Sequence, residues 1–123
     1  MILTIDTLHN LSKQLNIAFD GSQQDWAIEF ADPARLLDYI QFASNSDLKN
    51  EEAYGIMSLI LASYDDYLSD FGEDKVDIWK KITALLNQNP CLYEYLLNYW
   101  ALWGKNDDVF KITNHVRRYL QKV

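Results

Sequence analysis

The sequence is poor in the residues that interrupt or cross-link a chain. Its 123 residues include only four glycines, two prolines and one cysteine. Few glycines and prolines leave few turns, which favours long helices over many short strands. The single cysteine, Cys91, excludes an internal disulfide and is typical of a protein from a reducing compartment.

Residues that carry enzyme chemistry are also scarce. The two histidines, His9 and His115, stand alone, without a second His or Cys at the spacing of metal ligands. Cys91 has no evident base to activate it, and the isolated glycines form no phosphate-binding loop. An EF-hand with Gly72 at its sixth position would place Tyr67 first, where Asp is required. The sequence therefore predicts no catalytic residue, no cofactor and no metal, and we expect a protein that is not an enzyme.

Long hydrophobic runs are missing as well. The longest strongly apolar stretch covers residues 56–62, far too few to cross a bilayer. Residues 1–15 include Asp6 and polar side chains throughout, unlike a signal peptide. We therefore expect a cytoplasmic protein that does not enter a membrane.

The chain does have the residues of a packed core. Its hydrophobic fraction is 49% and its aromatic fraction is 14%, as in a folded domain. Apolar residues recur at helical spacing, and the short stretches between them predict antiparallel neighbours. The sequence predicts one all-α domain over residues 1–123. About six antiparallel helices would form a bundle or a short, HEAT-like stack of helical hairpins.

The expected helices follow from apolar spacing and from start signals. Asp32-Pro33 and Asn89-Pro90 each place a capping side chain before a proline at the first helical position, and Asn50 and Asn106 are further expected caps. The stretch 25–31 fits either an alternating strand or a short helix. The helix is preferred because no second strand-like run could pair with it. The longer helices are expected over residues 6–18, 33–45, 50–71, 74–86, 90–103 and 106–123.

The helix near residues 51–70 is expected at the centre of the fold. It is apolar on nearly all sides between residues 53 and 64, so neighbours should cover it from several directions. Residues 50–56 also match residues 106–112, and Pro33 matches Pro90 at almost the same offset. The match indicates either two related hairpins or two ordinary capped amphipathic helices.

The aromatic residues divide into two groups. Four lie on apolar faces and are expected in the core: Trp79, Trp100, Trp103 and Phe110. Three others are interleaved with carboxylates at the end of the 50–71 helix, and they fit either a recognition surface or an ordinary helix end: Tyr64, Tyr67 and Phe71. His115, next to Arg117 and Arg118, is expected at the solvated surface.

Acidic charge is concentrated in one part of the chain. The net charge of −7 argues against a nucleic-acid partner, whose phosphates require a basic footprint. Residues 20–77 contain 14 acidic and three basic residues, a local charge of −11, whereas residues 78–123 carry a local charge of +4. The cluster either keeps the protein soluble or forms a negative face that steers a basic partner.

Residues 50–105 resemble a family of small helical proteins. The match lies in residues 52–64, in residues 79–86, and in Asn89-Pro90 with the apolar helix up to Trp103. In this order they resemble the immunity proteins of bacterial contact-dependent inhibition and polymorphic toxin systems. There, a helix with a Tyr-Gly pair, an apolar run and a further Tyr precedes an acidic connection. The family often has a Trp shortly after the proline turn, where this chain has residues 91–93.

The resemblance implies a cytoplasmic protein that binds the toxic C-terminal domain of a cognate effector and blocks its active site. Many such toxins are nucleases with a basic substrate groove, for which an acidic segment would compete as a phosphate mimic. The alternative is a helical-repeat adaptor or regulator that docks a peptide or a partner helix. The expected partner-binding residues are Asp65, Asp66, Tyr67, Asp70, Glu73, Asp74 and Asp77.

Overall fold

The structure, a computed structural model, describes residues 2–121, and its regular elements are all helical. The predicted all-α class is confirmed, with seven α-helices in this range where about six were expected. In chain order the elements are α1 (Ile5–Leu15), α2 (Trp26–Glu29), the 3-10 helix η1 (Pro33–Arg35), α3 (Leu36–Asn45), α4 (Asn50–Phe71), α5 (Ile78–Leu86), the 3-10 helix η2 (Pro90–Tyr93), α6 (Glu94–Ala101) and α7 (Thr113–Gln121).

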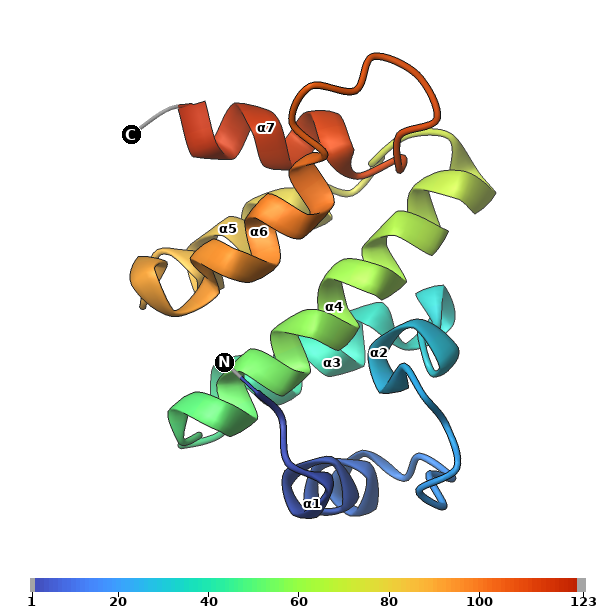
Figure 1. Cartoon of the computed structure of the whole chain (residues 1–123), viewed down its shortest axis with the longest axis vertical. Coiled ribbons are helices and arrows are strands. Elements are labelled where there is room, and N and C mark those ends of the chain that lie inside the picture. The colour runs from blue at the N-terminus through green and yellow to red at the C-terminus, as the bar shows by residue number, and fades with distance from the viewer. Residues whose placement is uncertain (1, 122–123) are drawn as a thin grey trace.

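Helix α4 runs through the middle of the molecule. Its 22 residues make it roughly 33 Å long at the usual helical rise. Every residue from 54 to 64 is buried, because α1, α2, α3, η1 and η2 all contact this helix. In Figure 1, α4 crosses diagonally between α1–α3 and α5–α7.

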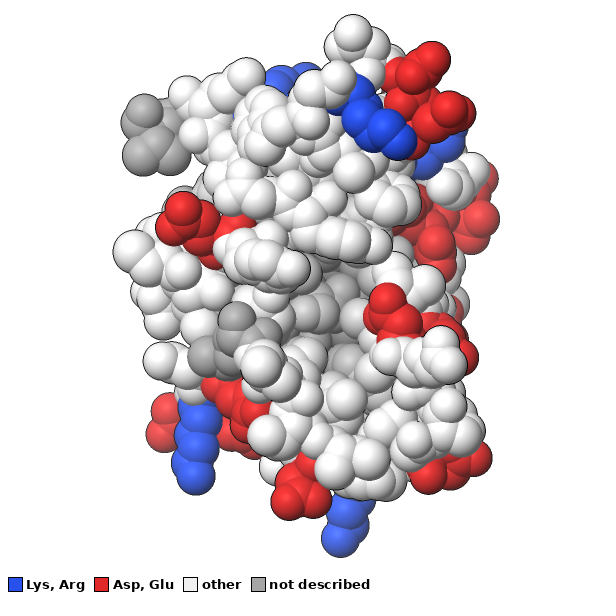
Figure 2. Space-filling model, viewed as in Figure 1, with Lys and Arg blue, Asp and Glu red and all other residues white. Residues whose placement is uncertain are grey.

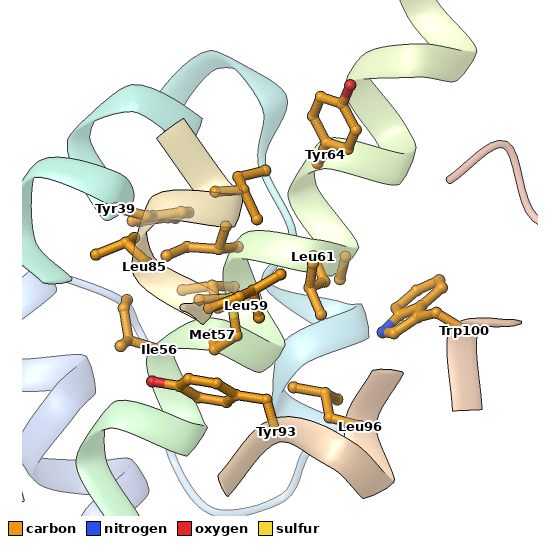
Figure 3. Packing of buried hydrophobic residues seen from close by; sticks show 14 of the residues in the cluster. Tyr39, Ile56, Met57, Leu59, Leu61, Tyr64, Leu85, Tyr93, Leu96 and Trp100 are labelled. Atoms are coloured by element: carbon orange, nitrogen blue, oxygen red, sulfur yellow. The ribbon is translucent and has the colours of Figure 1, made fainter. Parts of the chain in front are cut away.

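The core forms around this helix. Figure 3 shows side chains from several elements meeting the apolar residues of α4, among them Tyr39 of α3, Leu85 of α5 and Trp100 of α6. Tyr39 is also covered by Arg35, whose guanidinium lies 5.1 Å from the centre of the ring. Burying such large apolar side chains is the main stabilising contribution to the fold.

A glycine allows α1 to pack closely against α4. A Cβ atom at Gly55 would lie 2.8 Å from a methyl group of Leu11, which is fully buried. Beside this contact, the Glu51 carboxylate accepts hydrogen bonds from the Thr4 N–H and the Thr7 hydroxyl. Gly55, at the start of the apolar run, thus has a packing role, since a larger residue there would displace the buried Leu11 side chain.

The proline start signals are observed, with one difference in form. Asp32 accepts a hydrogen bond from the Ala34 N–H at 2.9 Å, as an N-cap should. Pro33 and Pro90 each begin a 3-10 turn that leads directly into α3 or α6. The expected cap Asn50 is wrong by one position, because Lys49 precedes α4 and its N–H donates to Glu52 three residues later.

Several helix ends differ from prediction because of left-handed residues. Helix α1 ends at Leu15 instead of residue 18, since Asn16 has φ 57°. Helix α5 begins at Ile78 instead of residue 74, since Asp77 has φ 60°. Helix α6 ends at Ala101, followed by Leu102 with φ 46°. A left-handed residue cannot continue a right-handed helix.

The expected last helix is too long at its beginning. Residues 105–112 form a loop with Asp108 at φ 54°, and α7 starts at Thr113. The two matching segments therefore differ in structure, because residues 50–56 are helical and residues 106–112 are not. The expected end of this helix, Val123, lies outside the described residues.

Candidate functional site

The seven predicted partner-binding residues lie on the last two turns of α4 and in the connection to α5. Asp65, Asp66, Tyr67 and Asp70 belong to α4, and Glu73, Asp74 and Asp77 follow it. They divide into residues that hold the fold together and residues that face solvent.

Two of these carboxylates are used within the fold. Asp65 accepts a hydrogen bond from the Ile112 N–H at 2.9 Å, which fastens the start of α7 to α4. Asp74 accepts from the backbone N–H groups of Ile78 at 2.9 Å and Trp79 at 2.7 Å, and from the Tyr64 hydroxyl at 2.9 Å. Asp74 thus satisfies the first amides of α5, the role expected of it at a helix start.

The Asp74–Tyr64 contact shifts both groups in a consistent direction. Partial burial by itself would raise the pKa of Asp74, but the N–H groups of Trp79 and Ile78 and the Tyr64 hydroxyl together lower it. Burial, and then the hydrogen bond to Asp74, raise the pKa of the Tyr64 hydroxyl. Asp74 is therefore held as a carboxylate and Tyr64 as a neutral donor.

Three carboxylates at this end of α4 face solvent: Asp66, Asp70 and Glu73. Between them lies Phe71, with 58% of its side chain exposed. We call Asp66, Asp70, Phe71 and Glu73 the acidic end. An exposed aromatic ring among carboxylates is a feature of protein-binding surfaces.

Like charges affect one another within the acidic end. Partial burial, followed by the charges of Asp65 and Asp70, raises the pKa of Asp66. Asp66 and Asp70 are four residues apart on a helix, where side chains are neighbours and equal charges repel. A cationic partner would relieve this repulsion.

The remaining acidic residue, Asp77, lies beside basic groups. Together with Lys80 and Arg118 it lines an open cavity of about 780 Å³ between α5 and α7. Asp77 therefore lies between the acidic end and the basic side chains of α5 and α7.

Tyr67 belongs to a row of aromatic rings that contact one another. Its ring centre is 6.1 Å from that of Tyr64 and 4.8 Å from that of Phe71. The Tyr64 ring in turn contacts Trp79 and His115, with ring centres 5.5 Å and 5.6 Å away. The row runs from the buried Tyr64 to the exposed Phe71.

The expectation for His115 is wrong. The side chain is half-buried against Tyr64 and Trp79, and its Nδ1 atom is buried without a hydrogen-bond partner. Burial and the Arg118 charge lower the pKa of His115, while Asp74 opposes the shift. The neighbouring Arg117 and Arg118 suggest a surface position, but they do not determine the direction of the His115 ring.

The acidic residues of segment 20–77 do not all lie on one face. Glu51 and Asp70 lie 19 positions apart on α4, roughly 28 Å along the helix axis. Figure 2 shows acidic side chains over the C-terminal end of α4, over the loop between α6 and α7, and at the lower edge of the molecule. This loop carries Asp107 and Asp108, from the basic part of the sequence, and its end is fastened to α4 by the Asp65–Ile112 hydrogen bond.

A cleft that the sequence did not predict lies on another side of α4. It has a volume of about 340 Å³ and lies between the N-terminal segment, α2 and α6. The exposed aromatic residues Tyr95 and Tyr99 line it. Their spacing of four residues on a short helix was the available signal. Trp103, eight positions after Tyr95 and expected in the core, is 49% exposed.

The described part of the chain holds no group of three or more His, Cys, Asp or Glu residues arranged to bind a metal ion. Within residues 2–121, none of the helices combines the length and the apolar character that crossing a bilayer requires. Cys91 is exposed on η2 and has a free thiol.

Comparison of the chain with protein-family models, with curated proteins and with solved structures finds no match in any of the three.

Proposed function

We propose that this chain is a cytoplasmic, non-enzymatic immunity protein. It binds the toxic C-terminal domain of a cognate effector and neutralises it by covering a basic active-site groove with the acidic end. The observation that carries the proposal is the exposure of Asp66, Asp70 and Glu73 around Phe71. These side chains offer the charge of a phosphate mimic together with an apolar contact.

The fold supports this surface in two ways. Asp65 and Asp74 fasten the flanking backbone by hydrogen bonds to Ile112, Ile78 and Trp79, so little conformational freedom is lost on binding. The raised pKa of Asp66 reflects burial and nearby like charges. Cations from a partner would stabilise the carboxylate, and the negative field would speed association.

Co-purification from the native host tests the function. We expect a stoichiometric partner domain with a basic surface, encoded beside this chain as part of a larger secreted effector. The partner's toxicity should be lost when the two are mixed. Recovery of the chain alone, or with a partner that has no toxic activity, would contradict the immunity function.

Charge reversal tests the surface. The double variant Asp66→Lys, Asp70→Lys should weaken toxin binding at least a hundredfold and reduce its dependence on salt concentration. The control is Asp38→Lys, Asp47→Lys, which changes the net charge equally at exposed positions on and after α3. Unchanged affinity and salt dependence in the first variant would show that the interface lies elsewhere.

A second candidate is an adaptor or regulator that docks a peptide or a partner helix without any toxin. The cleft between α2 and α6 favours it, because exposed tyrosines surround a concave apolar surface there. A neighbouring gene for a large secreted effector would favour the immunity function, and its absence would favour the adaptor function.

A further inference from the structure

The cleft between the N-terminal segment, α2 and α6 is a concave, mostly apolar feature outside the acidic end. Its volume of about 340 Å³ lies at the lower limit for small-molecule sites. In Figure 2 a hollow opens where Figure 1 shows the middle of α4, between α6 and α2. The main apolar and aromatic lining residues are Leu3, Leu8, Trp26, Ile28, Leu96 and Trp100.

The floor of the cleft is held in place before anything binds. The Trp26 indole N–H donates to the buried Ser12 hydroxyl at 2.8 Å. The Trp100 ring packs edgewise on Tyr99 and Phe110, with ring centres 5.3 Å and 4.7 Å away. A surface with fixed side chains loses little entropy when it is covered.

The rim of the cleft is open and aromatic. Tyr95 is 75% exposed, and Tyr99 and Ile28 are exposed on the two sides of the opening. A small molecule would leave these rims in water, whereas ligand sites normally bury most of their ligand. Exposed tyrosines beside a preformed hollow suit a protein segment that inserts a large side chain and covers the rim.

Charge identifies the kind of segment. Among the described residues that line the cleft, Asp25 alone is charged. In Figure 2 acidic side chains lie over α2 at the rim, and the Lys and Arg side chains in view lie near the top and bottom of the molecule. A second copy of this chain, with its net charge of −7, would be repelled from such a rim.

We propose that the cleft binds a segment of another protein that inserts a large apolar side chain and carries Lys or Arg beside it. The apolar anchor packs against Trp26, Leu96 and Trp100, and the basic residues lie near Asp25. This site is separate from the acidic end and is independent of the toxin proposal.

Selection from a library of random peptides displayed on phage tests the inference, with the intact chain as bait. We expect enriched peptides to share a large aliphatic or aromatic residue flanked by Lys or Arg. Synthetic copies should perturb the backbone amide NMR signals of α2 and α6. Their affinity should fall as salt concentration rises.

Rim variants make the test specific. Tyr95→Ala and Ile28→Ala change exposed side chains and should each weaken the selected peptides at least tenfold. The control is Leu37→Ala on α3, another exposed apolar residue that does not line the cleft, and it should leave the affinity unchanged. Variant folding is checked by thermal unfolding, and Tyr95→Phe should retain binding if Tyr95→Ala is destabilised.

Four results would overturn the proposal. The first is a failure to enrich any peptide, and the second is enrichment of peptides with neutral or acidic flanks. The third is a peptide affinity that is the same in Tyr95→Ala and in Ile28→Ala as in the wild type. The fourth is concentration-dependent dimerisation that Tyr95→Ala abolishes, because the occupant would then be a second copy. Peptide binding to the cleft does not depend on toxin binding by the acidic end. Failure of one proposal therefore leaves the other standing.

Discussion

Neighbouring carboxylates in this chain have different roles. Asp65 accepts from the Ile112 N–H, whereas Asp66, the next residue, faces solvent. Successive residues on a helix point about 100° apart, so one side chain can meet α7 while the next points away. The same division separates Glu73, which is exposed, from Asp74, which accepts hydrogen bonds at the start of α5.

Asp66 is expected to lower the stability of the free protein. Its pKa is raised by partial burial and by Asp65 and Asp70. Over the pH range between the ordinary and the raised pKa, the folded protein therefore keeps a proton on Asp66 that the unfolded chain has released. Between the ordinary carboxyl pKa and the raised value, stability falls as pH rises, and the full loss is present at neutral pH. Asp66→Asn should therefore raise the melting temperature at pH 7.

Differential scanning calorimetry checks this prediction across pH. The gain from Asp66→Asn should shrink as pH falls and should disappear below the ordinary carboxyl pKa, where Asp66 is neutral in both states. Asp38→Asn, at an exposed position on α3, is the control and should show a smaller change. A variant that is less stable than the wild type at pH 7 would show that the Asp66 carboxylate stabilises the fold.

At the scale of elements, a set of polar contacts links α7 to the end of α6. The Arg117 guanidinium donates to the carbonyl oxygens of Ala101, Leu102 and Lys105. These carbonyls lie at and after the end of α6, where a helix leaves its acceptors unsatisfied. The Thr113 hydroxyl donates to the Trp100 carbonyl oxygen at 2.8 Å and adds a second link between α6 and α7.

Arg117→Ala should weaken the attachment of α7 to the end of α6. The variant leaves partly buried carbonyl groups without their charged donor, and we expect a loss of about 2 kcal/mol in the free energy of unfolding. Urea unfolding followed by circular dichroism measures it. The neighbouring Arg118 is exposed, so Arg118→Ala is the matched control and should change stability by less than about 0.5 kcal/mol. Equal losses in the two variants would refute a capping role for Arg117.

At the scale of the whole molecule, His115 joins three helices. Its ring lies on α7 and contacts Tyr64 of α4 and Trp79 of α5, and Asp74 and Arg118 are the charged groups that act on it. Burial keeps the imidazole neutral in the folded protein. We therefore expect the packing of α7 on α4 and α5 to weaken when His115 is protonated.

Acidification should weaken the fold through His115. Because its pKa is lowered on folding, the stabilisation is complete above the ordinary histidine pKa of about 6.5 and is lost as pH falls through the lowered value. Urea unfolding between pH 7 and pH 5 should show this decline in the wild type. The slope should be smaller in His115→Phe and unchanged in His9→Gln, since His9 is exposed. NMR titration of the two imidazoles gives the pKa values directly.

The all-α class and most of the helix starts could be predicted from sequence. Helices depend on contacts three and four residues apart, so the Asp32 cap, the proline starts and the apolar spacing of 50–71 are readable in the chain itself. The location of an acidic cluster at the end of α4 could be predicted for the same reason. The left-handed conformations of Asn16 and Asp108 could not be predicted, because residues other than glycine rarely adopt them.

The sequence by itself thus determined the helical class, the long helix α4 and the residues that surround its acidic end. The tertiary structure decided which of those residues are free. It assigned Asp65 and Asp74 to the fold, turned His115 inward, left Trp103 exposed and opened the cleft beside Tyr95 and Tyr99. The reason is physical: local spacing sets which residues share a helix face, but exposure depends on the elements that pack against that face.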